Sequence, residues 1–125
     1  MIHEYFTFCE YIIQQSPLVI SYTTHIVMGS PSMGHIQGVI IFVDGSELTF
    51  FELLSQDQAA VRPVKYRFHY QRGNQFIFRY DNAPHHQELS TFPSHKHTSK
   101  GVEPAASVTF QHVFQEIVDM LIASD

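Results

Sequence analysis

The first and last parts of the chain carry apolar residues at helical spacing. In residues 2–14 the apolar positions lie three and four residues apart, which places them on one face of a helix that ends at Ser16-Pro17. Residues 110–122 repeat this spacing, and Thr109 stands where an N-cap residue is expected. The pattern therefore predicts two amphipathic helices.

Between these helices, apolar and polar residues alternate as they do in strands with one buried face. The alternation predicts five strands, over residues 18–28, 36–43, 46–54, 64–71 and 75–81. Asp44-Gly45 is a two-residue hairpin signal, because both residue types accept positive φ. We therefore expect an α+β fold, in which a five-stranded antiparallel meander carries both helices on one face.

The loop between the last two predicted strands decides which side chains face each other. A two-residue loop, Gly73-Asn74, would mix aromatic and basic side chains on both faces. A three-residue loop, 72–74, gives one aromatic and one polar face and sets Arg67 opposite Arg79. We predict the three-residue loop. Two facing arginines are destabilising unless an anion lies between them, so this register indicates a ligand.

Residues 82–104 show no periodicity and contain several histidines. A loop of about twenty residues in a small domain is usually functional or disordered. A chain of 125 residues has the size of one domain, so we expect a single domain over residues 1–125 that includes this long His-rich loop.

Nothing in the sequence predicts a membrane span or a secretion signal. The longest apolar run, 39–43, is far shorter than the ~20 residues that cross a bilayer, and the first residues lack a basic region. Cys9 is the only cysteine, which agrees with a reducing compartment. We expect Cys9 to be a buried small hydrophobe and the protein to be cytoplasmic, with no membrane association.

The basic residues are confined to one segment of the chain. All seven Lys and Arg residues lie between positions 62 and 100, where only two acidic residues oppose them, while the remaining ten acidic residues lie elsewhere. Five of the nine histidines fall in the same segment. Such segregation favours an anionic ligand: phosphate, nucleic acid or an acidic protein segment. The alternative is a basic strand that merely faces solvent.

The same segment contains the groups that RNA cleavage without a metal ion or other cofactor requires. These groups are a proton acceptor, a proton donor and cations that stabilise the transition state. We predict His69 with His95 or His97 as the acid–base pair. The full set of catalytic candidates is His69, Arg67, Arg79, Asp81, His85, His86, His95 and His97. The RNA-binding candidates are Lys65, Tyr70, Asn82 and Lys96.

Two other functions stay open. In an extended segment His95 and His97 point to one side, and His85 or His86 could complete a zinc or copper site. The signal for such a metal-binding module is weak, because no cysteine is near and Lys96 between the ligands adds an unfavourable charge. The second alternative is a non-catalytic protein that binds RNA or a nucleotide.

Three runs of the chain, 65–70, 76–86 and 89–97, resemble the TumE-type toxins of bacterial and archaeal toxin–antitoxin pairs. The resemblance also covers the hairpin at 34–53 and the closing helix. It implies a small toxin, an antitoxin partner with a helix-turn-helix DNA-binding domain, and RNA cleavage; a homodimer stays open. The family has proline where this chain has Gln87 and histidine where it has Ser94, so we expect His95 and His97 to carry the chemistry.

Overall fold

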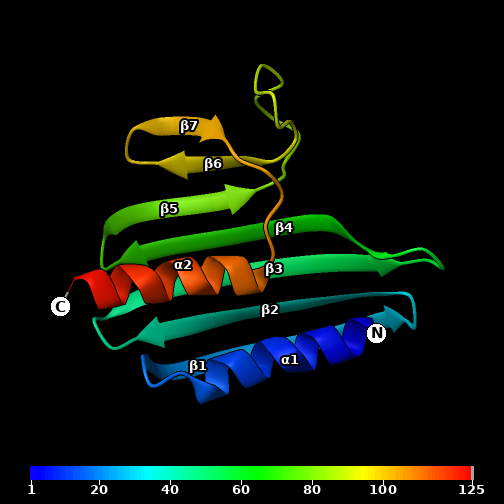
Figure 1. Ribbon diagram of the computed structural model, residues 1–125, viewed down its shortest axis with the longest axis horizontal. Helices are drawn as coiled ribbons and strands as arrows, with labels where there is room; N and C mark the ends of the chain where they lie inside the picture. Colours follow the sequence, from blue (N-terminus) through cyan, green and yellow to red (C-terminus); the bar gives the residue numbers. More distant parts are fainter. Residues whose placement is uncertain (125) are drawn as a thin grey trace.

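Seven antiparallel strands form one sheet whose spatial order follows the chain, and two helices cover one of its faces (Figure 1). The computed structural model describes residues 1–124. In chain order the elements are α1 (Ile2–Gln15), β1 (Val19–Ser30), β2 (Met33–Phe42), β3 (Ser46–Gln56), β4 (Val61–Arg72), β5 (Gln75–Asp81), β6 (His95–Thr98), β7 (Gly101–Pro104) and α2 (Phe110–Ala123). Within residues 1–124, no helix is long and apolar enough to cross a membrane.

The α+β class, the meander order and the packing of both helices on one face are confirmed. The strand number is wrong, because β6 and β7 form a hairpin inside the predicted loop 82–104. Every residue of β6 is polar, so no apolar period marks this strand in the sequence. Lys96 of β6 takes the place of an apolar residue: its Nζ lies 5.1 and 4.8 Å from the ring centres of Phe78 and Tyr80.

The turn between β4 and β5 also differs from the predicted one. The loop has two residues, Gly73-Asn74, and Ile77 is an extra residue of β5 that has no partner in β4. Because of this extra residue, the pairing of β5 with β4 shifts by one position after Ile77. Arg67 therefore lies opposite Asp81 instead of Arg79. The prediction that Arg67 and Arg79 face each other is therefore wrong. The argument that an anion must lie between them no longer applies.

The predicted hairpin at Asp44-Gly45 is present, with three loop residues, 43–45, instead of two. Gly45 has φ 84°, a left-handed conformation that glycine adopts without a steric cost. Asp44 Oδ1 accepts a hydrogen bond from the backbone N–H of Ser46 at 2.9 Å, which closes the turn.

The helix-covered face of the sheet forms an aromatic core. Phe110 of α2 packs on Phe50 of β3 with ring centres 4.9 Å apart, and Phe114 packs on Phe42 of β2 at 5.8 Å. Each large apolar side chain buried here contributes roughly 1.5–3 kcal/mol. Cys9 of α1 is buried as predicted, and its burial raises the pKa of the thiol to about 12. The thiol is therefore protonated and unreactive at neutral pH.

One carboxyl group, that of Glu52 on β3, is buried in this apolar layer. Glu52 is 2% exposed and accepts a hydrogen bond from the hydroxyl of Tyr5 on α1 at 2.9 Å. Burial raises the pKa of Glu52 to about 7, although the hydrogen bond from Tyr5 acts in the opposite direction. Ionisation of Glu52 therefore destabilises the folded state.

We expect Glu52→Gln to stabilise the protein above neutral pH, because the amide still accepts from Tyr5 and carries no charge. The pKa of Glu52 is about 7 when folded and 4.5 ordinarily, so the wild type loses stability as pH rises through this window. The loss between pH 5 and pH 8 is on the order of 2 kcal/mol. Urea unfolding at pH 5 and pH 8 measures this loss of stability. The free energy of unfolding of Glu52→Gln should depend less on pH than that of the wild type.

Glu47→Gln is the matched control, because Glu47 lies on the same strand with its side chain on the other face of the sheet. It should follow the wild-type pH dependence. If the free energy of unfolding depends on pH equally in the wild type and in Glu52→Gln, Glu52 is not the cause of the loss of stability.

Candidate functional site

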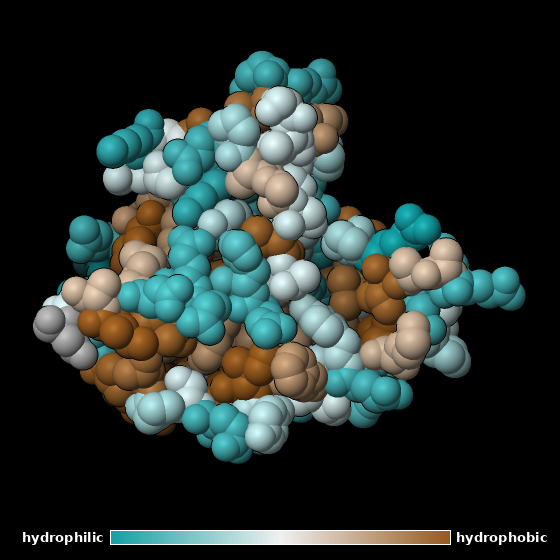
Figure 2. Space-filling model, in the orientation of Figure 1, coloured by the Kyte–Doolittle hydropathy of each residue, from teal (hydrophilic) through white to brown (hydrophobic). Residues whose placement is uncertain are grey.

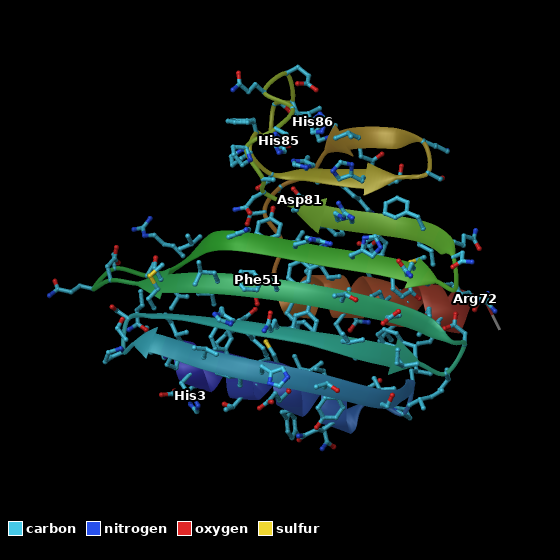
Figure 3. The ribbon with its side chains drawn as sticks, turned by 180° about the vertical axis from the view of Figure 1, so that it is seen from behind. His3, Phe51, Arg72, Asp81, His85 and His86 are labelled. Atoms are coloured by element: carbon cyan, nitrogen blue, oxygen red, sulfur yellow. The ribbon has the colours of Figure 1, made fainter. Side chains whose placement is uncertain are left out.

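Strand alternation directs a second set of side chains to the face of the sheet that the helices leave uncovered, which we call the open face (Figure 3). There, the end of β5, the start of β6 and the loop between them surround a pocket of about 370 Å³ beside β4. Figure 3 labels Asp81, His85 and His86 at this corner. The lining consists of Lys65, Tyr66, Arg67, Arg79, Asp81, Ala83, His85, His86, His95 and His97.

Asp81 and His95 form the buried base of this open-face pocket. They pair across β5 and β6, with His95 Nε2 2.9 Å from Asp81 Oδ1, and their side chains are 10% and 2% exposed. His95 Nδ1 donates to the carbonyl oxygen of Pro93 at 2.9 Å. The backbone N–H of Ala83 donates to Asp81 Oδ1 at 3.0 Å. These contacts hold both side chains in fixed orientations.

Two further imidazoles, those of His86 and His97, pack against His95 and complete what we call the histidine cluster. Their ring centres lie 5.2 and 4.9 Å from that of His95 and 5.7 Å from each other. The side chains of His86 and His97 are 34% and 29% exposed, so a ligand can reach both. His97 Nε2 also lies 3.6 Å from Asp81 Oδ2.

The pKa of His97 lies below its usual value. Burial is the largest cause, and the nearby His95, Arg79 and His86 lower the pKa further, while the Asp81 carboxylate raises it. The imidazole of His97 is therefore uncharged at neutral pH.

Arg67 and Arg79 bring positive charge to the histidine cluster. Arg67 lies opposite Asp81 in the β4–β5 ladder, and Arg79 lies opposite His97 in the β5–β6 ladder. Within residues 1–124, the ion pairs of arginine side chains involve Arg62 and Arg72 only. The guanidinium groups of Arg67 and Arg79 are therefore available to an anion.

His69 lies on the open face but not in the pocket lining. Its Nδ1 accepts a hydrogen bond from Arg79 Nε at 3.2 Å, so its other nitrogen, Nε2, carries the proton and donates to Gln71 Oε1 at 2.7 Å. With both nitrogens occupied, His69 positions Arg79. The structure therefore does not bring His69 into the pocket with His95 and His97, its predicted partners in acid–base chemistry.

Tyr70 and Lys96, both predicted to contact RNA, lie on the helix-covered side of the sheet. Tyr70 is 2% exposed, and its hydroxyl donates to Ser46 Oγ at 2.7 Å. Lys96 Nζ lies 3.0 Å from the carboxylate of Glu116 on α2, which also accepts from the Tyr80 hydroxyl at 2.6 Å. Strand alternation sends both side chains away from the open face, which corrects the prediction.

The other two RNA-binding candidates have different surroundings. Lys65 lines the pocket. Asn82 Oδ1 accepts from the backbone N–H of Tyr66 at 3.0 Å, and its Nδ2 donates to the carbonyl oxygen of Val64 at 3.2 Å. Asn82 therefore ties the start of the loop to β4, and its amide is engaged with the backbone.

An aromatic pair extends the open face beyond the pocket. Phe51 of β3 stacks on His35 of β2, with ring centres 5.0 Å apart and planes at 30°. Phe51 lies opposite Arg67 in the β3–β4 ladder, which connects the pair to the pocket. No clear sequence signal marks Phe51, because its neighbours on the same face of β3 are the polar Thr49 and the apolar Leu53.

Another hollow, of about 790 Å³, lies along α2 on the helix-covered side, where Figure 2 shows mainly hydrophilic residues across the middle of the molecule. Its lining consists of Thr109, Gln111, His112, Gln115, Glu116, Asp119, Met120 and Ala123. This lining has two carboxylates and neither Lys nor Arg, so it does not suit an anionic ligand. The open-face pocket is the better candidate site.

The histidine cluster also meets a geometric requirement for holding a metal ion. One ring nitrogen from each of His86, His95 and His97 lies within 4.8 Å of the others. Imidazole nitrogen is a common ligand of zinc and copper.

Comparison with known proteins identifies a family. The family model described as Toxin TumE matches residues 10–124, most of the chain. Searches of the curated proteins and of the solved structures find no match.

We expect Asp81→Ala to lower the free energy of unfolding, because it removes the partner of the buried His95 Nε2 and of the Ala83 N–H. Leaving a buried donor such as His95 Nε2 unpaired costs about 1–3 kcal/mol, and the partly buried Ala83 N–H adds less. Urea unfolding measures the change. The control is Glu88→Ala: Glu88 is 69% exposed and 3.4 Å from His86 Nδ1. The free energy of unfolding of Glu88→Ala should stay within about 0.5 kcal/mol of the wild-type value. Equal losses of stability in Asp81→Ala and Glu88→Ala would contradict the structural role of Asp81.

Proposed function

The chain belongs to the TumE family of toxins from toxin–antitoxin systems, and on this premise we propose that it cleaves single-stranded RNA in the open-face pocket. The observation that carries the proposal is the gathering of the two partly exposed imidazoles of His86 and His97 and two arginines free of carboxylate partners around one pocket. The reaction needs no metal ion, and its RNA substrate places the site of action in the cytoplasm.

The proposed reaction assigns one proton transfer to each exposed imidazole. His97 removes the proton of a ribose 2′-hydroxyl, and the 2′-oxygen attacks the adjacent phosphorus. The bond to the 5′-oxygen then breaks, and His86 protonates this leaving oxygen. The products are a 2′,3′-cyclic phosphate and a 5′-hydroxyl. Arg67 and Arg79 stabilise the negative charge on the phosphate oxygens in the transition state.

In this proposal, the buried residues position the reacting groups. His95 holds Asp81, whose second carboxylate oxygen faces His97 Nε2 at 3.6 Å. That contact orients the ring and leaves Nδ1 of His97 for the substrate proton. His69 acts one step further away, because its hydrogen bond holds Arg79.

The stacked rings of Phe51 and His35 supply a surface for unpaired bases. Sequence-tolerant RNA-binding surfaces combine aromatic rings that stack on bases with cations that contact the backbone. Phe51 and Arg67 are neighbours across β3 and β4, so one strand of RNA can contact both. We assign Phe51 to base stacking and Lys65 with Arg67 to the phosphates.

The family implies a cognate antitoxin, and the open face is the surface where it would block RNA. An acidic segment of the antitoxin complements Lys65, Arg67 and Arg79, and charge complementarity accelerates such association. An antitoxin seated there inhibits by covering the pocket directly.

We expect His97→Ala and His86→Ala each to lower the cleavage rate of a single-stranded RNA by roughly 10²-fold or more, the usual contribution of a general acid or base. The assay follows oligonucleotide cleavage in EDTA, with circular dichroism to confirm folding. His25→Ala, an exposed residue of β1, is the control and should cleave at the wild-type rate. His69→Ala should have a smaller effect than His97→Ala.

Near-wild-type cleavage by both His86→Ala and His97→Ala would remove the catalytic assignment. Loss of wild-type cleavage in EDTA would overturn its independence of metal. RNA binding by the wild type without any cleavage would instead favour a toxin that sequesters RNA.

We expect Phe51→Ala to weaken binding of a single-stranded DNA of matching sequence, which lacks the 2′-hydroxyl and is not cleaved. Loss of one base–aromatic stack costs about 1–3 kcal/mol. Fluorescence anisotropy measures the affinity. Tyr11→Ala is the control, because Tyr11 is an exposed aromatic residue on α1 and should not contact the nucleic acid. Equal affinities of Phe51→Ala and the wild type would exclude the stacking role.

A further inference from the structure

We propose that His86, His95 and His97, together with Asp81, form a binding site for one divalent transition-metal ion, for which zinc is the best match. The site stands on geometry alone and does not depend on RNA cleavage. Three imidazole nitrogens and one carboxylate oxygen are a ligand set that zinc takes in tetrahedral coordination.

The distances are close to those of a preformed site. Ring nitrogens of the three histidines lie within 4.8 Å of one another. The carboxylate of Asp81 lies between two of them, with Oδ1 2.9 Å from His95 Nε2 and Oδ2 3.6 Å from His97 Nε2. Ligand atoms around a tetrahedral zinc with bonds of about 2.0–2.2 Å are about 3.3 Å apart. The side chains must therefore rotate toward one another to admit the ion.

The surroundings of the histidines match those of metal ligands. A histidine that binds a metal through one nitrogen usually donates from the other to a carbonyl or carboxylate group. His95 donates from Nδ1 to the carbonyl oxygen of Pro93, and His86 Nδ1 lies 3.4 Å from Glu88 Oε1. Each ring can therefore turn Nε2 to the ion, and in His95 this nitrogen would exchange its present contact with Asp81 Oδ1 for the metal.

The charge of Lys96, which weakens the sequence signal for a metal, does not lie at the cluster. Alternation along β6 turns His95 and His97 to the open face and Lys96 to the other face. Lys96 Nζ is 3.0 Å from Glu116 of α2, so its charge is neutralised on the far side of the sheet.

The backbone at His86 directs its ring toward the cluster. His86 has φ 62°, a left-handed conformation that is uncommon for residues other than glycine. Histidine adopts this conformation more readily than most other residues. Here the conformation accompanies the packing of the His86 ring on His95 and His97, the arrangement that completes the ligand set.

Metal binding also has a consequence for activity, which, unlike the site itself, rests on the proposed function. Zinc occupies the imidazole nitrogens that transfer protons in the cleavage reaction. One bound zinc ion per chain therefore inhibits cleavage, and removal of zinc by EDTA restores it.

The test of the site is a cobalt titration of the metal-free full-length protein in the absence of RNA. Tetrahedral Co²⁺ absorbs strongly in the visible range, so we expect an absorption band that saturates at one equivalent and disappears when Zn²⁺ is added. His86→Ala and His97→Ala should each weaken cobalt binding by at least 100-fold. Asp81→Asn should weaken it by 10- to 100-fold.

His25→Ala is the matched control and should bind cobalt as the wild type does. Circular dichroism checks that each variant is folded, and His97→Gln replaces His97→Ala if that variant unfolds. Absence of the visible band, or equal cobalt affinity in the wild type and both histidine variants, would overturn the site.

The two proposals fail separately. Cobalt binding by a protein that cleaves no RNA either with or without EDTA removes the proposed function and leaves the metal site. Cleavage in EDTA by a protein that binds no cobalt removes the metal site and leaves the proposed function. Cleavage unaffected by one equivalent of bound zinc would overturn the inhibitory consequence.

Discussion

The contact between His95 Nε2 and Asp81 Oδ1 joins the two halves of the candidate site. It lies at the end of β5 and the start of β6, where the loop carrying His86 leaves and returns to the sheet. Because both side chains are buried, the contact fixes where the histidine cluster forms and which way its exposed rings face. The positions of His86 and His97 relative to the arginines of β4 and β5 follow from it.

The sheet keeps its core and its chemistry on opposite faces. Phe68 and Tyr70 of β4 pack under the helices, while Arg67 and His69 of the same strand face outward. This separation allows the open face to carry several like charges, since the aromatic layer behind it supplies stability. Glu52, a carboxyl buried in that layer, is a departure from this rule, and its stability cost grows as the pH rises from about 4.5 to about 7.

The helices, the first five strands and the meander order could be predicted because each has an apolar period that sequence alone reveals. The hairpin β6–β7 could not, since the residue on the covered side of β6 is Lys96, whose Nζ lies over aromatic rings, instead of an apolar residue. The bulge at Ile77 leaves no local signal, yet it decides the partners of Arg67. The residue types of the site were predictable; the placement of His86 depends on one backbone torsion that no pattern specifies.

Glu116 of α2 holds the strands of the site from behind, through Tyr80 of β5 and Lys96 of β6. A ribosome releases β5 and β6 before α2, and domains acquire their tertiary contacts only as the required segments emerge. During synthesis, the two strands that carry Asp81 and His95 therefore lack this support until the last helix has left the ribosome. The final geometry of the histidine cluster therefore depends on a helix that is synthesised after both of these strands.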